Sequence, residues 1–323
     1  MRRPSLAAIA AVAAAGLLLS GCASAEPGAN DGGGAGMVEV VTSTNVYGDL
    51  AKTIGGERVE VTSIIDRMSQ DPHSYEATAR DKLAISGADL LVENGGGYDA
   101  FMHQLADDTG KDHDFIITAA GLSKVEGAPE DGEHAEEPAA AGHEGHNHGE
   151  FNEHVWYDLA TAGAVAGQIA ERLAALDPEH AAEFTANADA FQKRVDGLQG
   201  QLDDVAAKVS GAAVAASDPV PLHLFDAAGL KNRTPADFIE AVEEGADAPP
   251  TALRSTMDLL EPGEVEFLAY NEQTESSQTQ QLRKAAEQAG IPVVVFTETL
   301  PEGEDYLTWM AANIKSIEDN VRG

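Results

Sequence analysis

Short apolar runs alternate with segments of helical hydrophobic spacing in the first part of the chain. The runs typical of β-strands lie at residues 38–41, 59–65, 89–93 and 115–118. Between them, apolar residues at spacings of three and four predict helices at residues 47–54, 79–86 and 98–105. Strands that alternate with helices predict a parallel sheet covered by helices.

From residue 159 to residue 209 the pattern is helical, with a break at Asp177-Pro178. A single apolar stripe then recurs at spacings of three, four and seven: Phe184, Phe191, Val195, Leu198, Leu202, Val205 and Val209. This stripe predicts one helix of about 30 residues, buried on one side.

The remaining chain repeats the first part in kind but not in sequence. It predicts strands at residues 212–216, 265–270 and 293–296, and helices at residues 235–244, 279–289 and 306–321. Two α/β lobes on either side of a long helix therefore form the expected fold. The expected segments are an N-terminal lobe (37–179), a linking helix (180–209) and a C-terminal lobe (210–323).

The first 36 residues do not fit this fold. Arg2 and Arg3 precede an apolar stretch that is too short for a comfortable membrane span. The stretch ends in Leu19-Ser20-Gly21-Cys22, which resembles a bacterial lipobox. We expect residues 1–22 to be a lipoprotein signal, Cys22 to carry the lipid, and residues 23–36 to form a flexible tether. The protein is then anchored outside the cytoplasmic membrane.

The formal net charge is −35, with 55 acidic and 20 basic residues. Nucleic-acid binding needs a basic patch, and none is visible. Excess carboxylate instead raises the local concentration of cations.

A histidine-rich acidic insert occupies residues 126–150. His134, His143, His146 and His148 lie there among Glu, Asp, Gly, Ala and Pro, and no Lys or Arg occurs between Lys124 and Arg172. Such a tract is typical of transition-metal binding and cannot pack a core. We expect a solvated loop that binds metal weakly.

Four further metal-ligating side chains follow predicted strands or this loop. His73 follows the second strand, His154 follows the loop, and Asp218 and Glu298 directly follow strands of the second lobe. Ligands bind at the carboxyl ends of strands in open α/β sheets, so the fold is expected to bring these four together.

The chain resembles the zinc and manganese solute-binding proteins of bacterial ABC importers. Asp71-Pro72-His73-Ser74-Tyr75-Glu76 and the segment from Asn152 to Asp158 match that family's first two ligand motifs. The resemblance implies a cleft between two lobes, joined by a long backbone helix, with His73, His154 and Glu298 as metal ligands. Glu153 stands where the family usually has Pro, and Glu298 where Asp is more frequent.

The third ligand is predicted to be Asp218, with His223 as the alternative. Zinc members commonly have His at this place and manganese members Glu, whereas the His-rich loop is typical of zinc importers. We therefore expect Zn²⁺ as the transported ligand, with Mn²⁺ as the alternative.

The resemblance implies metal capture by a monomer and delivery to an ABC permease and its ATPase. Neither an HExxH motif nor a nucleophile elbow occurs in the sequence, which predicts a binding protein rather than an enzyme. A surface metal buffer or adhesin without a transporter and, more remotely, an exported metallohydrolase are the alternatives.

Overall fold

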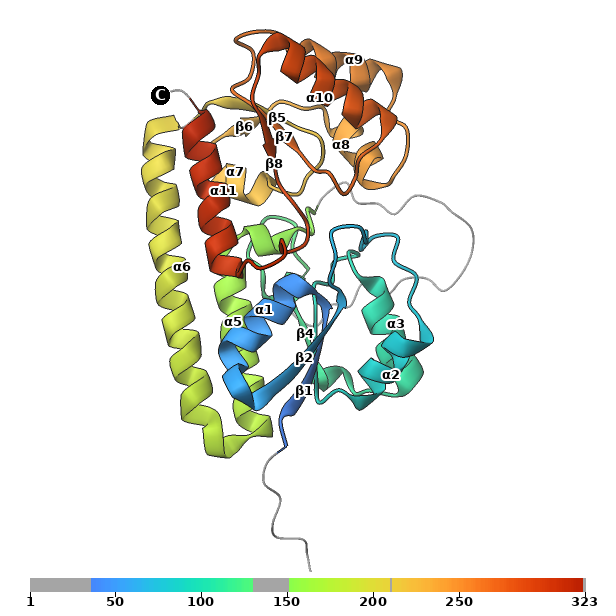
Figure 1. Ribbon diagram of the computed structural model, residues 1–323, viewed down its shortest axis with the longest axis vertical. Helices are drawn as coiled ribbons and strands as arrows, with labels where there is room; N and C mark the ends of the chain where they lie inside the picture. The colour runs from blue at the N-terminus through green and yellow to red at the C-terminus, as the bar shows by residue number, and fades with distance from the viewer. Residues whose placement is uncertain (1–35, 130–150, 210, 322–323) are drawn as a thin grey trace, which may run out of the picture. The chain divides into compact units, whose positions relative to one another are not determined.

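The computed structural model describes residues 36–129, 151–209 and 211–321. In the N-terminal half, four parallel strands form a sheet in the order β2-β1-β3-β4 (Figure 1). The strands are β1 (Val38–Thr44), β2 (Val59–Ile65), β3 (Leu90–Glu93) and β4 (Ile116–Thr118). β1 pairs with β2 on one side and with β3 on the other, which confirms the predicted parallel sheet.

Helices cover both faces of this sheet. Val40 of β1 belongs to the core shared with α1 and α5, whereas its neighbour Val41 packs with residues of α2 and α3. Successive strand residues point to opposite faces, so both neighbours are buried and the strand is apolar throughout. The helices of this half are α1 (Asn45–Gly55), α2 (Ala79–Gly87), α3 (Ala100–Thr109), α4 (Ala119–Leu122) and α5 (Leu159–Leu176).

The turn before α3 explains why this helix begins later than the expected residue 98. Gly95, Gly96 and Gly97 all have positive φ angles, of 71°, 67° and 100°. A Cβ on Gly95 would lie 2.3 Å from Cγ2 of Thr118, so this close approach requires glycine as well as the conformation.

The long helix α6 (Ala181–Val209) follows the predicted break. Pro178 begins a short 3-10 turn (Pro178–His180), because proline lacks the N–H that a continuing α-helix needs. All seven residues of the predicted stripe are buried in α6. They belong to a core that contains residues of both halves, so α6 packs along both.

The C-terminal half contains a second parallel sheet, in the order β6-β5-β7-β8. The strands are β5 (Ala213–Ala216), β6 (Lys231–Asn232), β7 (Leu268–Tyr270) and β8 (Val293–Val295). The helices are α7 (Leu222–Ala227), α8 (Ala236–Glu243), α9 (Pro250–Asp258), α10 (Ser277–Ala289) and α11 (Tyr306–Asn320). Sequence patterning misses α7, β6 and α9. β6 has two residues and is too short to show a hydrophobic period. α9 has a short amphipathic face formed by Ala252, Leu253, Thr256 and Met257, which sequence analysis overlooked.

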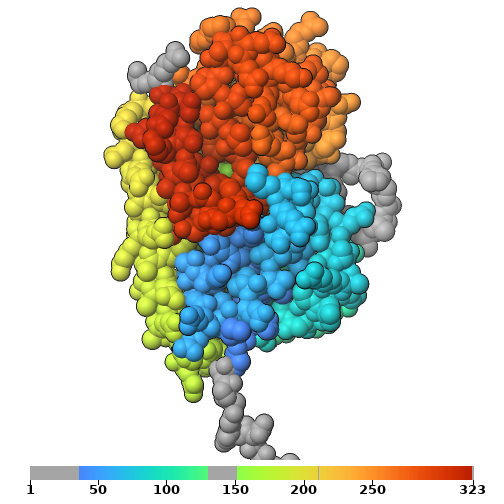
Figure 2. All heavy atoms as spheres, in the orientation of Figure 1, coloured from blue at the N-terminus to red at the C-terminus, as the bar shows by residue number. Residues whose placement is uncertain are grey.

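The halves meet where their strands end, and Figure 2 shows them in contact along this boundary. Asn45 follows β1 and donates its side-chain N–H to the carbonyl of Leu300, 2.8 Å away, while its Oδ1 accepts the Leu300 N–H at 2.9 Å. The hydroxyl of Tyr157 donates to the carbonyl of Thr297 at 2.8 Å. The carboxyl ends of both sheets therefore face one another. Within the three described segments, no helix is both long and apolar enough to cross a bilayer.

Candidate metal centre

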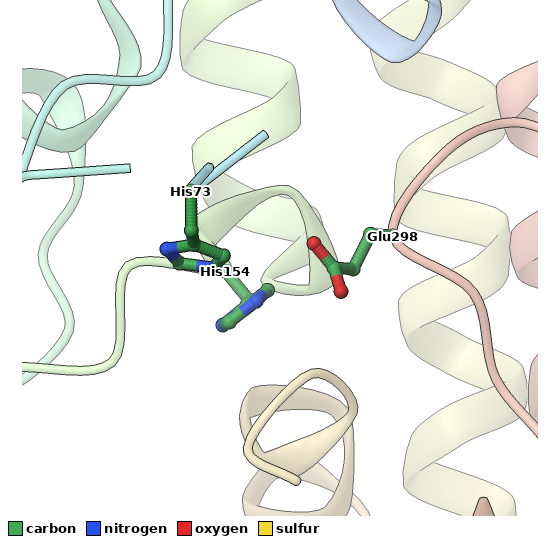
Figure 3. Close-up of side chains that lie close together, drawn as sticks. All are labelled: His73, His154 and Glu298. Carbon is green, nitrogen blue, oxygen red and sulfur yellow. The ribbon is translucent and has the colours of Figure 1, made fainter. Parts of the chain in front are cut away.

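Three of the predicted ligands converge between the two halves. His73 lies in the loop after β2, His154 directly precedes a 3-10 turn (Val155–Tyr157), and Glu298 follows β8. One ligand atom from each lies within 4.8 Å of the other two. Figure 3 shows the carboxylate of Glu298 pointing toward the two imidazole rings. His154 and Glu298 are each 1% exposed. Two imidazoles from one half thus face a carboxylate from the other.

His154 is held in one orientation by Asn152. The Oδ1 of Asn152 lies 2.8 Å from Nδ1 of His154 and also accepts the backbone N–H of His154 at 3.1 Å. A carboxamide oxygen only accepts hydrogen bonds, so Nδ1 carries the proton and Nε2 presents its lone pair. Burial, together with the nearby His73 and His223, lowers the pKa of His154 well below its usual value. The ring is therefore neutral, as a metal ligand must be.

Two donors orient Glu298. The side-chain amide of Asn271 donates to Oε1 at 2.8 Å, and the hydroxyl of Tyr98 donates to Oε2 at 3.2 Å. Burial and the charge of Asp218 raise the pKa of Glu298 to about 8. None of the described groups that shift this pKa is a cation, and a bound metal ion would favour the charged carboxylate.

Asp218, directly after β5, is 2% exposed and accepts a hydrogen bond from the Thr274 hydroxyl at 2.7 Å. Burial raises its pKa to about 6. Its charge contributes to the raised pKa of Glu298, so the two carboxylates are electrostatic neighbours. Among the described residues, the group of ligand atoms within 4.8 Å contains His73, His154 and Glu298 without Asp218.

The alternative ligand His223 lies on α7 and points to the segment before His154. Its Nε2 lies 2.7 Å from the backbone carbonyl of Asn152, which can only accept, so Nε2 carries the proton. His223 and Asn152 line a pocket of 480 Å³, together with Val125, Glu126, Asp158 and Leu222. Through its hydrogen bond to Asn152, Nε2 of His223 links the C-terminal half to the N-terminal half.

A second group of possible ligands shares His73. It adds Glu153 and Glu243, the last residue of α8, again within 4.8 Å of one another. Oε1 of Glu153 lies 3.7 Å from Nδ1 of His73. Burial raises the pKa of Glu153 to about 7, while burial and the charge of Glu153 raise that of Glu243 to about 9. Sequence analysis missed Glu243, because nothing distinguishes one Glu at a helix end from the other acidic residues of α8.

Some residues that hydrogen-bond to the carboxylates of the site were also given too little weight in the sequence. Asn271 and Thr274 follow β7 and fit an ordinary polar turn from sequence, yet they donate to Glu298 and Asp218. Their position after a strand was the available indication. Cys22 and the loop histidines His134, His143, His146 and His148 lie outside the described residues.

Comparisons with known proteins agree with this geometry. Residues 40–320 match the family model described as zinc-uptake complex component A, periplasmic. The chain belongs to this family. Membership confirms the resemblance seen in the sequence and makes the chain a divalent-metal-binding component of an uptake system, not an enzyme.

Individual relatives are distant but cover most of the chain. The manganese ABC transporter substrate-binding lipoprotein PsaA of Streptococcus mitis is 22% identical, across 94% of this chain and 95% of that protein. The periplasmic zinc-binding protein TroA of Treponema pallidum is 18% identical, with a TM-score of 0.68, covering 89% of this chain and all of that chain. The protein FpvC of Pseudomonas aeruginosa, in complex with Ni²⁺, is 22% identical with a TM-score of 0.66, covering 88% of this chain and 97% of that chain. These structural similarities confirm the two-lobed α/β fold.

Proposed function

We propose that the chain captures one zinc ion between its halves, bound by His73, His154, Glu298 and Asp218, for import. The observation that carries this proposal is the convergence of the first three, with ligand atoms within 4.8 Å, from segments distant in sequence. Two imidazoles and buried carboxylates form a donor set suited to zinc. Ligands from both halves would make the bound ion stabilise the closed arrangement.

Delivery to an ABC permease and its ATPase completes the proposed function. Support comes from membership of the uptake family and from the ABC transporter names of relatives such as PsaA. We further propose a monomer that is lipid-anchored at Cys22, after removal of residues 1–22, with residues 23–36 as a tether. The boundaries of the two lobes at residues 37–179 and 210–323 belong to the same proposal.

Manganese is the second candidate, favoured by two observations. Relatives at 22–26% identity, including MntA of Halalkalibacterium halodurans, are named as manganese proteins. Carboxylate oxygens suit Mn²⁺ better than Zn²⁺; Glu153 and Glu243 add carboxylates beside His73, and Asp218 is an electrostatic neighbour of Glu298. The four histidines between residues 126 and 150 support zinc instead, because imidazole is a better ligand for zinc.

The test is metal titration of purified protein with and without His73. In His73→Ala, loss of a ligand from a largely buried site should weaken zinc binding by several kcal/mol, roughly 100-fold or more. His180→Ala is the matched control, because His180 lies at the start of the long helix region and hydrogen-bonds Asp177 at 2.6 Å. Unchanged zinc affinity in His73→Ala would refute the site. Competition between Zn²⁺ and Mn²⁺ in the unaltered protein decides between the two metals.

A further inference from the structure

A second pair of histidines faces each other on the N-terminal half. His103 lies on α3 and His113 begins the 3-10 turn (His113–Phe115) before β4. Their rings meet edge to face, with centroids 4.4 Å apart, and Nε2 of His103 lies 3.2 Å from Nδ1 of His113. Neither belongs to the two ligand groups between the halves.

A carboxylate fixes the outer nitrogen of each ring. Oε1 of Glu93 lies 3.0 Å from Nδ1 of His103, and Oδ1 of Asp107 lies 2.8 Å from Nε2 of His113. Ionised carboxylates only accept hydrogen bonds, so Nδ1 of His103 and Nε2 of His113 carry the protons. In the neutral rings the two facing nitrogens then both present lone pairs. A second proton on one ring makes this contact a hydrogen bond, and a metal ion bound by both lone pairs would replace that proton.

We propose that the His103–His113 pair is an auxiliary site for a divalent transition metal ion, in the first place zinc, bound by Nε2 of His103 and Nδ1 of His113. Two imidazole nitrogens on one tetrahedral zinc, each at 2.0–2.1 Å, lie about 3.3 Å apart. The 3.2 Å separation fits that requirement. Imidazoles that ligate a metal through one nitrogen and donate the other N–H to a carboxylate are the usual arrangement of zinc sites.

The surroundings favour a cation that enters from solvent. The side chain of His103 is 25% exposed and that of His113 is 38% exposed, whereas Glu93 is 4% exposed and firmly held by the Thr118 hydroxyl at 3.0 Å. The hydrogen bond that His103 donates to Glu93 raises the pKa of His103. A proton therefore competes for the position between the rings, and zinc would displace it. Because both rings are partly exposed to water, this site should bind zinc more weakly than the buried centre.

Zinc titration by calorimetry tests the pair, in a background without the other predicted sites. That background combines His73→Ala and His154→Ala with alanine at His134, His143, His146 and His148. We expect one weakly bound zinc ion per chain, which His103→Ala and His113→Ala each remove. His180→Ala is the control, because its imidazole also donates to a carboxylate but has no second histidine beside it. Asp107→Asn should weaken binding about 10-fold, since it only orients His113.

Testing His103→Ala in the otherwise unaltered chain keeps the test independent of that background. There, His103→Ala should lower the zinc stoichiometry at saturation by one ion and leave the tightest site unchanged. The proposal is overturned if the background protein, folded by circular dichroism, binds no zinc. It is equally overturned if His103→Ala leaves the zinc stoichiometry unchanged both in that background and in the otherwise unaltered chain, because the pair would then share only a proton.

Discussion

Oε1 of Glu243 lies 3.9 Å from Nδ1 of His154, across the boundary between the two halves. Glu243 ends α8 of the C-terminal half, and its buried carboxyl also faces Glu153 and His73 of the N-terminal half. Burial, and after it the charge of Glu153, raise the pKa of Glu243 to about 9. The contact therefore places a protonated carboxyl of one half beside two histidines of the other.

Replacing Glu243 by Gln should stabilise the metal-free protein, and more so at high pH. The ordinary pKa of Glu243 is 4.5 and burial raises it to about 9 in the folded chain. Between these values the folded state holds a proton that the unfolded state has lost, so stability falls as pH rises. Gln cannot lose that proton. We expect Glu243→Gln to raise the Tm by at least ~2 °C at pH 8.5, and by less at pH 5.

The exposed neighbour Glu244 provides the matched control. Glu244→Gln makes the same substitution at the next residue after the end of α8, but there the side chain is exposed to solvent. Its thermal melts should therefore follow the unaltered protein at both pH values. A Glu243→Gln variant that melts no higher than Glu244→Gln at pH 8.5 would show that burial does not penalise the Glu243 carboxylate.

The third ligand can be decided by comparing alanine variants of Asp218 and His223. Asp218 is buried beside Glu298, and its loss should weaken zinc binding roughly 100-fold. His223 donates from Nε2 to the carbonyl of Asn152, so its loss should weaken binding less than about 10-fold, through altered positioning of His154. Calorimetry on both variants measures this. The opposite order would make His223 the ligand and Asp218 a supporting carboxylate.

Metal-induced stabilisation should increase from pH 5.5 to pH 8. Burial raises the pKa of Glu298 from 4.5 to about 8 and that of Asp218 from 3.8 to about 6. Between the ordinary and the raised pKa values, the metal-free folded chain holds protons that the unfolded chain has lost. These protons stabilise the metal-free fold at low pH and their contribution is lost as pH rises through the folded values. Zinc must displace them.

The proton count gives a direct measurement. At pH 7 the carboxyl of Glu298 is mostly protonated, so zinc binding should release about one proton from it, as calorimetry in buffers of different ionisation enthalpy would detect. His154, with its lowered pKa, is already neutral at this pH and contributes no proton. A zinc-induced change in Tm that stays constant from pH 5.5 to pH 8 would contradict protonated carboxyls in the centre.

Much of the fold was predictable because the spacing at which hydrophobic residues recur along a segment indicates which of its faces is buried. The seven-residue stripe from Phe184 to Val209 faces a continuous core, and the break at Asp177-Pro178 follows from proline chemistry, so both were predicted correctly. α9 has the helical spacing Ala252, Leu253, Thr256 and Met257, but this face spans little more than one turn and was overlooked. Element ends were less predictable, as at α3, where three glycines delay the helix start.

The site was predictable where a ligand type coincided with a strand end. Glu298 met both conditions, whereas His73 and His154 were expected from the motifs around them, and the three converge. Glu243 has a ligand side chain but follows no strand, since it ends a helix that long-range packing brings against His154. Tyr98 likewise reaches Glu298 only through the fold, at 3.2 Å. Contacts between elements distant in sequence have no local pattern, so only the three-dimensional structure shows them.

The His-rich loop should be dispensable for the tight site and useful when zinc is scarce. Ordering a segment rich in Gly, Ala and acidic residues costs roughly 1–2 kcal/mol per residue in backbone entropy, so its histidines should bind zinc weakly. Deleting residues 127–149 should keep the affinity of the centre within about threefold, remove weak zinc equivalents and slow capture, as stopped-flow kinetics would measure. Alanine at His134, His143, His146 and His148 should reproduce the slower capture while the loop length stays unchanged. If deletion abolishes tight binding, the loop supplies a ligand to the centre. If neither variant alters stoichiometry or capture rate, the loop is an acidic connection only, and the preference for zinc over manganese loses its main support.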